Sequence, residues 1–372
     1  MNDAIVRAAQ AANTLGLRLL AAQGGDGNAI VSAASLSIAL AMLAEGAGGD
    51  AEAELTAILG LTGNARTQAY AAIGAALGAY HDGEFSLTTL PETPYFRVAN
   101  NVVLNDGFGA DRAFLASLME HFGATVQYTD LGSAAGKAVL DEWVRENTAG
   151  LIDTSAVEPD PMLRLVLQNA LLFAARWRSA FKGMDTVTEP FTRADGSTVG
   201  AEMMHGTKVV RHALADGYQV IQLPYTADFA AYAVLTPEAF DAEGVSAVID
   251  SLPYEPDSVS ISLPSFDLKS ATDVGEYLQQ IGVRAIFEDP ESFRGISLEE
   301  DVVVGAIAQQ ARLIMDEDGT IGAAVTEIAM RAMSLRFSEI EFRADRPFLL
   351  LIRHEATGID VFTAYIGDPT AE

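Results

Sequence analysis

The chain has 372 residues, 49% of them hydrophobic, which is enough for one large core or two ordinary ones. Its net charge of −28 argues against nucleic acid and anionic membranes as partners, and a highly soluble or salt-adapted surface is the simplest explanation of the acidity. Because cysteine is absent, disulfides, zinc–thiolate sites and cysteine nucleophiles are excluded.

The start of the chain gives no targeting signal. Residues 1–22 are predicted to form an amphipathic helix carrying Arg7 and Arg18, not a signal peptide. The uncharged run at 29–44 is short and interrupted by serines, so it is not a predicted membrane span. The compartment stays open between the cytoplasm and secretion with a signal trimmed away.

Helical patterns dominate the first third of the chain. The predicted helices are 2–22, 33–45, 51–59, 66–80, 111–122 and 134–147. A buried strand is expected at 96–104.

Strand patterns dominate the remainder. They cover 163–173, 199–204, 218–223, 230–235, 259–263, 349–354 and 360–366, with one helix at 272–281. Helices first and strands later predict an α+β protein with a large sheet. Since no Pro/Gly/Ser-rich linker divides the chain, we expect a single domain over 1–372.

The segment from 316 to 352 is the most informative. Read as a strand, its first half places small or apolar side chains on one face, namely Thr320, Gly322, Ala324, Thr326, Ile328 and Met330. Both charges of this stretch, Glu327 and Arg331, lie on the other face, so the first face could be buried in a sheet. A helix over the same residues is an equally good reading of the periodicity.

Neither this segment nor the polar residues elsewhere give strong evidence for a metal or catalytic site. A calcium loop would use Asp316, Asp318, Thr320 and Glu327, but Ile321 occupies the place where that loop needs glycine, so a plain Asp-Gly turn is preferred. The five histidines form no metal-binding pair, and no GxSxG elbow or phosphate loop is present. We therefore expect no metal and no cofactor, and a metal-dependent hydrolase is a distant rival.

Several segments together resemble the serpin family. NAIVSAASLSIALAML at 28–43 is similar to the family's NVFxSPxSIxxALAML, VLDEWVRENTAG at 139–150 to the helix ending in WVxxxTxG, and VLQNALLFAARWRSAF at 166–181 to LVNAIYFKGxWxxxF. AEMMHG, VIQLPY and ISLPSF follow in the family's order, DEDGT at 316–320 resembles the hinge, and FRADRPFLLLI at 342–352 fits the C-terminal signature. Each motif is weak alone, but their order along the chain is specific.

The resemblance implies the serpin fold: mostly N-terminal helices around a large central sheet, two further sheets, and an exposed reactive loop with its hinge at about 316–342. It also implies an inhibitor of serine proteases, not an enzyme. A protease forms an acyl-enzyme on the loop, and the cut loop inserts as a new strand and carries the protease with it. Eleven residues from Thr320 to Met330 would span about 36 Å as a strand at roughly 3.3 Å each.

Counting along the family pattern from Gly319 implies Met333 and Ser334 as the reactive bond. Methionine suits chymotrypsin-, elastase- or subtilisin-like pockets, whereas Arg331 and Arg336 would be attacked if the register differs. A cysteine protease stays open as a target. The implied hinge comprises Glu317, Gly319, Thr320, Ile321, Gly322, Ala323, Ala324 and Thr326.

The resemblance also implies two polar groups that control the sheet. Ser32, Ser35 and Asn169 match the shutter, where the family's usual histidine is replaced by Gln309, and Trp177 matches the breach at the top of the sheet. The lysine that usually pairs with Glu317 falls at Ser265, so this ion pair is not expected.

Further departures from the family pattern bear on function. Ile321 stands where glutamate is usual and Gly322 where alanine is typical, which would slow insertion and favours a non-inhibitory, binding or chaperone-like serpin as the alternative. Since Arg66 is the only basic residue of helix 66–80, we expect no heparin-type activator, and we expect a monomer.

Overall fold

The computed structural model describes residues 2–23, 27–80, 90–237, 240–305, 307–320 and 340–371. Six of the helices lie before residue 148 and agree with the predicted ones to within a few residues. The helices are α1 (Asp3–Gln23), α2 (Ala33–Ala44), α3 (Gly49–Leu59), α4 (Gly63–Gly78), α5 (Arg112–Phe122), α6 (Ala134–Asn147), α7 (Ala242–Asp250), α8 (Val274–Gln280) and α9 (Ala285–Glu288), with short 3-10 turns at Gly183–Asp185 and Pro290–Phe293.

Within the described ranges, six strands form one sheet in the order β10-β11-β12-β4-β2-β3. Their bounds are β10 (Phe266–Asp273), β11 (Ala308–Met315), β12 (Gly319–Thr320), β4 (Leu165–Arg176), β2 (Tyr95–Asn105) and β3 (Thr125–Thr129). The predicted helix at 272–281 begins later than expected, because Asp273 still pairs in β10 and its side chain caps α8 by accepting the N–H of Gly275.

The other described strands form a nine-stranded sheet in the order β1-β15-β14-β8-β7-β6-β9-β13, with β5 on β6. Their bounds are β1 (Ala29–Val31), β5 (Thr186–Thr192), β6 (Thr198–Ala215), β7 (Tyr218–Pro224), β8 (Phe229–Leu235), β9 (Asp257–Pro264), β13 (Ile340–Arg343), β14 (Phe348–His354) and β15 (Ile359–Ile366). The two further sheets that we expected are the two ends of this one, since β6 pairs with β5 and β9 along its first part and with β7 at its end.

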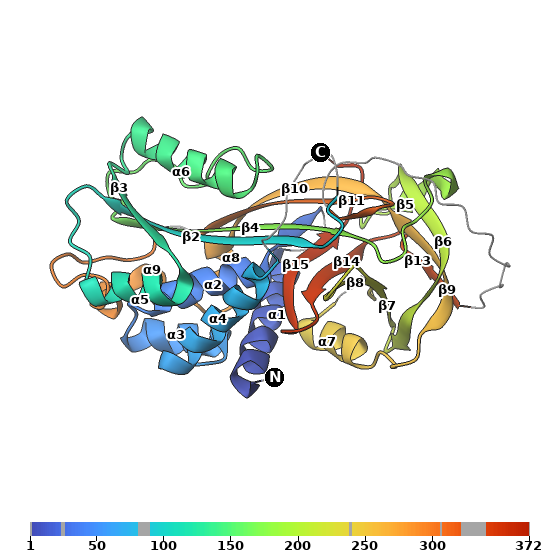
Figure 1. Ribbon diagram of the computed structural model, residues 1–372, viewed down its shortest axis with the longest axis horizontal. Helices are drawn as coiled ribbons and strands as arrows, with labels where there is room; N and C mark the ends of the chain where they lie inside the picture. Colours follow the sequence, from blue (N-terminus) through green and yellow to red (C-terminus); the bar gives the residue numbers. More distant parts are fainter. Residues whose placement is uncertain are drawn as a thin grey trace.

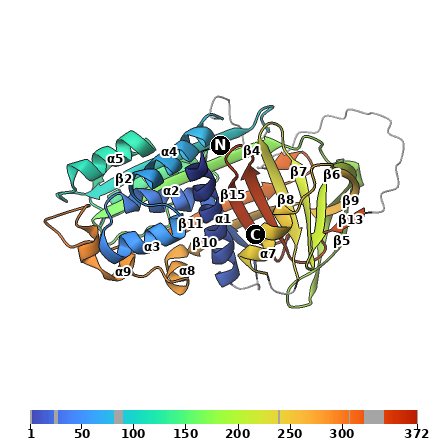
Figure 2. The same ribbon diagram turned by 90° about the horizontal axis from the view of Figure 1, so that it is seen from below.

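The six-stranded sheet is covered on both faces. Figure 1 shows α6 above it and α1 to α4 below it, and Figure 2 shows the lower helices in front of the sheet. The core continues under the second sheet, where β14 is buried from Phe348 to Ile352 between β15 and β8. Strands buried on both faces read as continuous apolar runs, which explains the sequence FLLLI.

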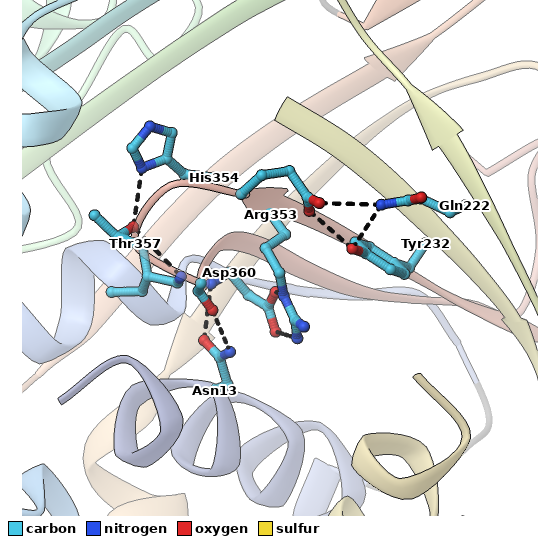
Figure 3. Close-up of polar contacts among 10 residues, drawn as sticks. Asn13, Gln222, Tyr232, Arg353, His354, Thr357 and Asp360 are labelled. Atoms are coloured by element: carbon cyan, nitrogen blue, oxygen red, sulfur yellow. Dashed lines mark hydrogen bonds and ion pairs between the residues drawn. The ribbon is translucent and has the colours of Figure 1, made fainter. Parts of the chain in front are cut away.

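A buried cluster of Asn13, Arg353 and Asp360 connects α1 to the β14–β15 hairpin (Figure 3). Arg353 Nε donates to Asp360 Oδ1 at 2.7 Å, and the Asp360 side chain is fully buried. On the other side Asn13 accepts the N–H of Asp360 at 2.8 Å and donates to the carbonyl of Gly358 at 2.8 Å. The ion pair therefore satisfies a carboxylate that has no access to water.

Replacing Arg353 by methionine should lower the free energy of unfolding by about 3–5 kcal/mol, because the carboxylate of Asp360 would remain buried without its partner. Thermal unfolding of the intact protein measures this. The double variant Arg353→Met/Asp360→Leu should recover most of the loss. Arg145→Met, which breaks an exposed pair with Glu142, is the control and should change little. A single variant as stable as the control would contradict the assignment.

Candidate functional site

The six-stranded sheet is incomplete between β4 and β11. Both strands pair antiparallel with β12, Thr320 lying opposite Ala175 on one side and Met315 on the other, so β4 and β11 run parallel. Below Thr320, no strand of the described part of the chain lies between them. A cavity of about 470 Å³ occupies this position, lined by both strands, by α2 and by the chain around the end of α6. We call this space the gap.

The register shows which residues face each other across the gap. Counting six residues back from Ala175 along β4 leads to Asn169, and counting six back from Met315 along β11 leads to Gln309. These two residues therefore lie at the same level of the gap. A strand antiparallel to both edges would fill the space between them, with its own hydrogen-bonding groups directed at each edge. Leu167 and Leu171 of β4 are only half-buried beside the cavity. The gap therefore has the polarity, direction and apolar lining of a strand site.

A polar network lies beneath the gap at the start of α2. Ser32 caps this helix by accepting the N–H of Ser35 at 3.2 Å, and its hydroxyl donates to the carbonyl of Val361 in β15 at 2.8 Å. Gln309 accepts the N–H of Ser32 at 2.8 Å and donates to its carbonyl at 3.2 Å. The backbone of Ser32 is thus tied directly to one edge of the gap.

The same network reaches the other edge through Ser35. The hydroxyl of Ser35 donates to Asn169, and the amide of Asn169 donates to Asn100 Oδ1 at 2.6 Å. Asn100 in turn donates to the carbonyl of Phe122 at the end of α5 at 2.8 Å. The expected group of Ser32, Ser35, Asn169 and Gln309 is therefore brought together, and it spans the gap from β11 to β2.

The upper end of the gap is closed by aromatic residues. The Trp177 indole N–H donates to the carbonyl of Asp316 at 2.9 Å, and its backbone N–H donates to the carbonyl of Asp318 at 2.8 Å. The Trp177 ring stacks on Tyr225 with centroids 4.3 Å apart. The Tyr225 hydroxyl lies 2.5 Å from Thr320 Oγ1, and both residues are buried. These contacts fix the turn between β11 and β12.

The turn itself is held by the side chain of Asp316. Asp316 Oδ1 accepts the N–H groups of Asp318 at 2.9 Å and Gly319 at 3.0 Å. Burial raises the pKa of Asp316, and these two hydrogen bonds oppose that shift. These contacts are those of the plain Asp-Gly turn that the sequence favoured, and Glu327, the last ligand of the alternative calcium loop, lies outside the described residues.

Gly319 is needed because the backbone of β4 lies very close to it. Its backbone is not in the left-handed region, so conformational freedom at a bend does not explain it. A Cβ at this position would lie 2.2 Å from the carbonyl oxygen of Ala175 and 2.9 Å from Arg176 Cα. Only glycine lets β12 approach β4 closely enough to pair.

Glu317 is held without a lysine. Its carboxylate accepts the hydroxyl of Thr186 at 2.6 Å, and its carbonyl accepts the N–H of Phe181 at 2.8 Å. The expected counterpart Ser265 instead donates its backbone N–H to the carbonyl of Glu202. The connection after β4 is anchored by Lys208, which donates to the carbonyls of Ser179 and Ala180 and lies 3.9 Å from the Phe181 ring centre.

The remaining predicted site residues, Ile321, Gly322, Ala323, Ala324, Thr326, Met333 and Ser334, lie outside the described residues, as does the helix alternative for this stretch. Within the described ranges, no group of three or more potential metal ligands is found. Among the same residues, no helix is both long and apolar enough to cross a membrane.

Two residues of the site were missed by sequence reasoning. Asn100 was one half of an Asn-Asn pair inside an otherwise apolar strand prediction, and that polar interruption was the signal available for it. Tyr225 ends the VIQLPY motif, but nothing in the sequence indicates that its ring stacks on Trp177.

Residues 10–369 of the chain match the family model described as "Serpin (serine protease inhibitor)". The chain is 30% identical over 368 residues to Iripin-2 of Ixodes ricinus, which covers 95% of this chain and 91% of that protein. It is 27% identical over 363 residues to the leukocyte elastase inhibitor of Bos taurus, with 92% and 93% covered.

Solved structures agree with the fold. Human thyroxine-binding globulin superimposes with a TM-score of 0.83 at 21% identity, covering 99% of this chain and all of that one. The thermophilic serpin tengpin in its native state superimposes with a TM-score of 0.82 at 19% identity, covering 99% and 95%. At these identities the likeness concerns the fold alone.

Gly319→Ala should separate β12 from β4, because the added Cβ would collide with the Ala175 carbonyl. We expect faster amide hydrogen exchange in residues 316–320 and a lower unfolding temperature. Gly183→Ala, where a Cβ meets nothing within 4 Å, is the matched control and should leave both unchanged. Equal exchange in the two variants would show that the close approach is not required.

Gln309→His should make the network beneath the gap sensitive to pH. A neutral imidazole can still accept the Ser32 N–H, whereas an imidazolium cannot, so the folded state should hold the histidine pKa below its ordinary value of about 6.5. The variant should then lose roughly 1–3 kcal/mol of stability relative to the native protein as the pH falls below about 6.5.

Unfolding midpoints at pH 7.5 and 5.5 would measure this change. Gln310→His on the neighbouring position is the control, since Gln310 lies outside the network, and it should not show the same fall. If the difference in midpoint between Gln309→His and the native protein is the same at both pH values, the hydrogen bond to Ser32 does not contribute the expected stability.

Proposed function

Because the chain belongs to the serpin family, we propose that it is an irreversible inhibitor of serine proteases that acts by covalent trapping. The target's catalytic serine oxygen attacks the carbonyl carbon of Met333, the peptide bond to Ser334 breaks, and the new amine leaves with a proton. The acyl-enzyme then remains attached to a loop that inserts into the gap. The catalytic groups belong to the target, so this chain is not itself an enzyme and needs no cofactor.

The observation that carries this proposal is the match between the gap and the loop. Thr320 already lies opposite Ala175, and extending the same register downward would set Thr326 opposite both Asn169 and Gln309. Met330 would then lie opposite Leu165, the first residue of β4. The eleven residues from Thr320 to Met330 therefore match β4 from Ala175 down to Leu165, and the first of these pairs is already made.

The driving force for insertion would come from the hydrogen bonds and apolar contacts that a strand in the gap would add. Facing edges of β4 and β11 present backbone groups for a strand to pair with, and side chains such as Leu167 and Leu171 are only half-buried. Insertion would add hydrogen bonds on both edges and remove apolar area from water, worth about 25 cal/mol per Å². Cutting the loop frees it to reach this more stable arrangement.

The bait residue points to the class of target. Met333 as the acylated residue favours chymotrypsin-, elastase- or subtilisin-like proteases, and a cysteine protease with a similar pocket stays open. The relatives include a protein named leukocyte elastase inhibitor, which supports the elastase-like choice. We further propose that the chain acts as a monomer, as one domain over 1–372 with its reactive loop at about 316–342, and without a heparin-type activator.

A non-inhibitory serpin is the second candidate, and the hinge sequence favours it at two positions. Ile321 replaces the usual glutamate, and Gly322 costs about 0.5–1 kcal/mol relative to alanine inside regular structure. Slower insertion would let the protease hydrolyse the acyl-enzyme before it is distorted. The loop would then be cut without trapping.

Incubation with chymotrypsin, elastase and subtilisin in turn should give a band on a denaturing gel at the summed mass, with a released peptide beginning at Ser334. A cut after Arg331 or Arg336 would instead correct the register toward trypsin-like targets. Clean cleavage without an adduct from every protease would contradict the inhibitor and favour the second candidate.

A control variant, Thr326→Arg, should separate cleavage from trapping. It would bring a charge between Asn169 and Gln309 on insertion, while the bait bond seven residues away stays unchanged. We expect the protease to cut this variant as fast as the native protein, and the trapped fraction to fall at least about tenfold.

A further inference from the structure

The breach contains a contact that the family resemblance did not assign in this sequence. The Tyr225 hydroxyl lies 2.5 Å from Thr320 Oγ1, so the two side chains share a hydrogen bond. We propose that Tyr225 is a positioning residue that holds Thr320 in the sheet of the uncut protein, so that insertion starts from a strand whose first residues are already paired. This inference rests on the proposed inhibitory function and adds a specific residue to it.

The ring of Tyr225 is fixed from several sides. It is fully buried and stacks on Trp177 at an interplanar angle of 11°. Its backbone N–H donates to the carbonyl of Phe229 at 3.0 Å, and Phe173 from β4 packs edge-on against the ring at 5.4 Å. A ring held in this way presents its hydroxyl at one position. Burial also raises the pKa of Tyr225, so the hydroxyl stays protonated.

Thr320 is held on both sides by backbone pairing as well. It lies opposite Ala175 of β4 and Met315 of β11, and its exposed fraction is 1%. The preceding Gly319 approaches the Ala175 carbonyl too closely for any side chain. The described part of β12 has two residues and few ladder hydrogen bonds, so a side-chain contact at Thr320 contributes a large share of what keeps this part in place.

Starting a strand between two edges is the slow part of insertion, because the first residues must be ordered before later pairs repay that cost. A hinge that is already paired removes this step. The protease is trapped only if insertion is faster than hydrolysis of the acyl-enzyme, so loss of the starting pairs should change the division between trapping and cleavage. It should leave the first attack on the loop unchanged.

Tyr225→Phe tests the proposal because it keeps the stacked ring and removes only the hydroxyl, leaving Thr320 Oγ1 buried without that partner. The matched control is Tyr70→Phe, which removes a hydroxyl bonded to the carbonyls of Ala8 and Leu59 from an equally buried ring that does not line the gap. Adding Thr320→Val to Tyr225→Phe replaces both polar groups and should restore part of the lost effect.

The first readout needs no protease. Amide hydrogen exchange of residues 316–320 in the uncut protein should become roughly five- to tenfold faster in Tyr225→Phe than in Tyr70→Phe. The second readout is the number of inhibitor molecules consumed per trapped protease, which should rise several-fold while the rate of the first cleavage stays the same.

The outcomes are distinct. Unchanged exchange in Tyr225→Phe would overturn the proposal, and so would faster exchange with an unchanged ratio of trapping to cleavage. If the native protein traps no protease, the proposed function fails, and the exchange measurement still decides whether Tyr225 holds Thr320 in place. A fall in trapping equal to that of Tyr70→Phe would show a general loss of stability and would also contradict the positioning role.

Discussion

The structure depends on the separation of β4 and β11, two parallel strands of one sheet that, within the described residues, are joined at their upper end by Gly319 and Thr320 of β12. A sheet normally pairs its inner edges, so this arrangement forgoes hydrogen bonds and apolar burial that the same chain could make. Other features of the fold maintain it. The α2 start supports the gap from below through Ser32 and Ser35, and α6 covers the opposite face of the sheet (Figure 1).

The chemistry around the gap departs from the usual family pattern at the two positions where the sequence indicated it, and at both a neutral side chain replaces one that can carry a positive charge. Gln309 makes the network at Ser32 from groups that do not titrate, and Ser265 leaves Glu317 to a hydroxyl partner, Thr186. One cation near the hinge is Lys208, whose burial lowers its pKa to about 8 and whose ammonium donates to backbone carbonyls. A cation thus anchors the connection after β4, whereas the hinge residues Glu317 and Thr320 hydrogen-bond to the hydroxyl groups of Thr186 and Tyr225.

The sequence predicted the positions of helices and strands along the chain better than the way the strands pair. Helices α5 and α6 each bury one face and are capped by Asp111 and Ser133, so their positions followed from local sequence pattern. Strands β10 and β11 were missed because polar residues such as Lys269 and Arg312 interrupt them, and Arg312 is neutralised by Asp267 on the neighbouring strand. The family resemblance named Asn169 and Gln309, but that they lie at one level follows only from a register set through β12, which no local pattern contains.

Gly319 and Tyr225 act together to keep the hinge in the sheet. A hinge that must both stay in the sheet and extend it needs close backbone approach, which glycine supplies, and a side-chain contact that does not block the strand's growth. Thr320 meets Tyr225 at the top of the gap, whereas the growing strand would extend from its other side toward Asn169. Holding the first residue from above leaves every position below it free to pair, so the contact that restrains the uncut hinge need not be broken for insertion to proceed.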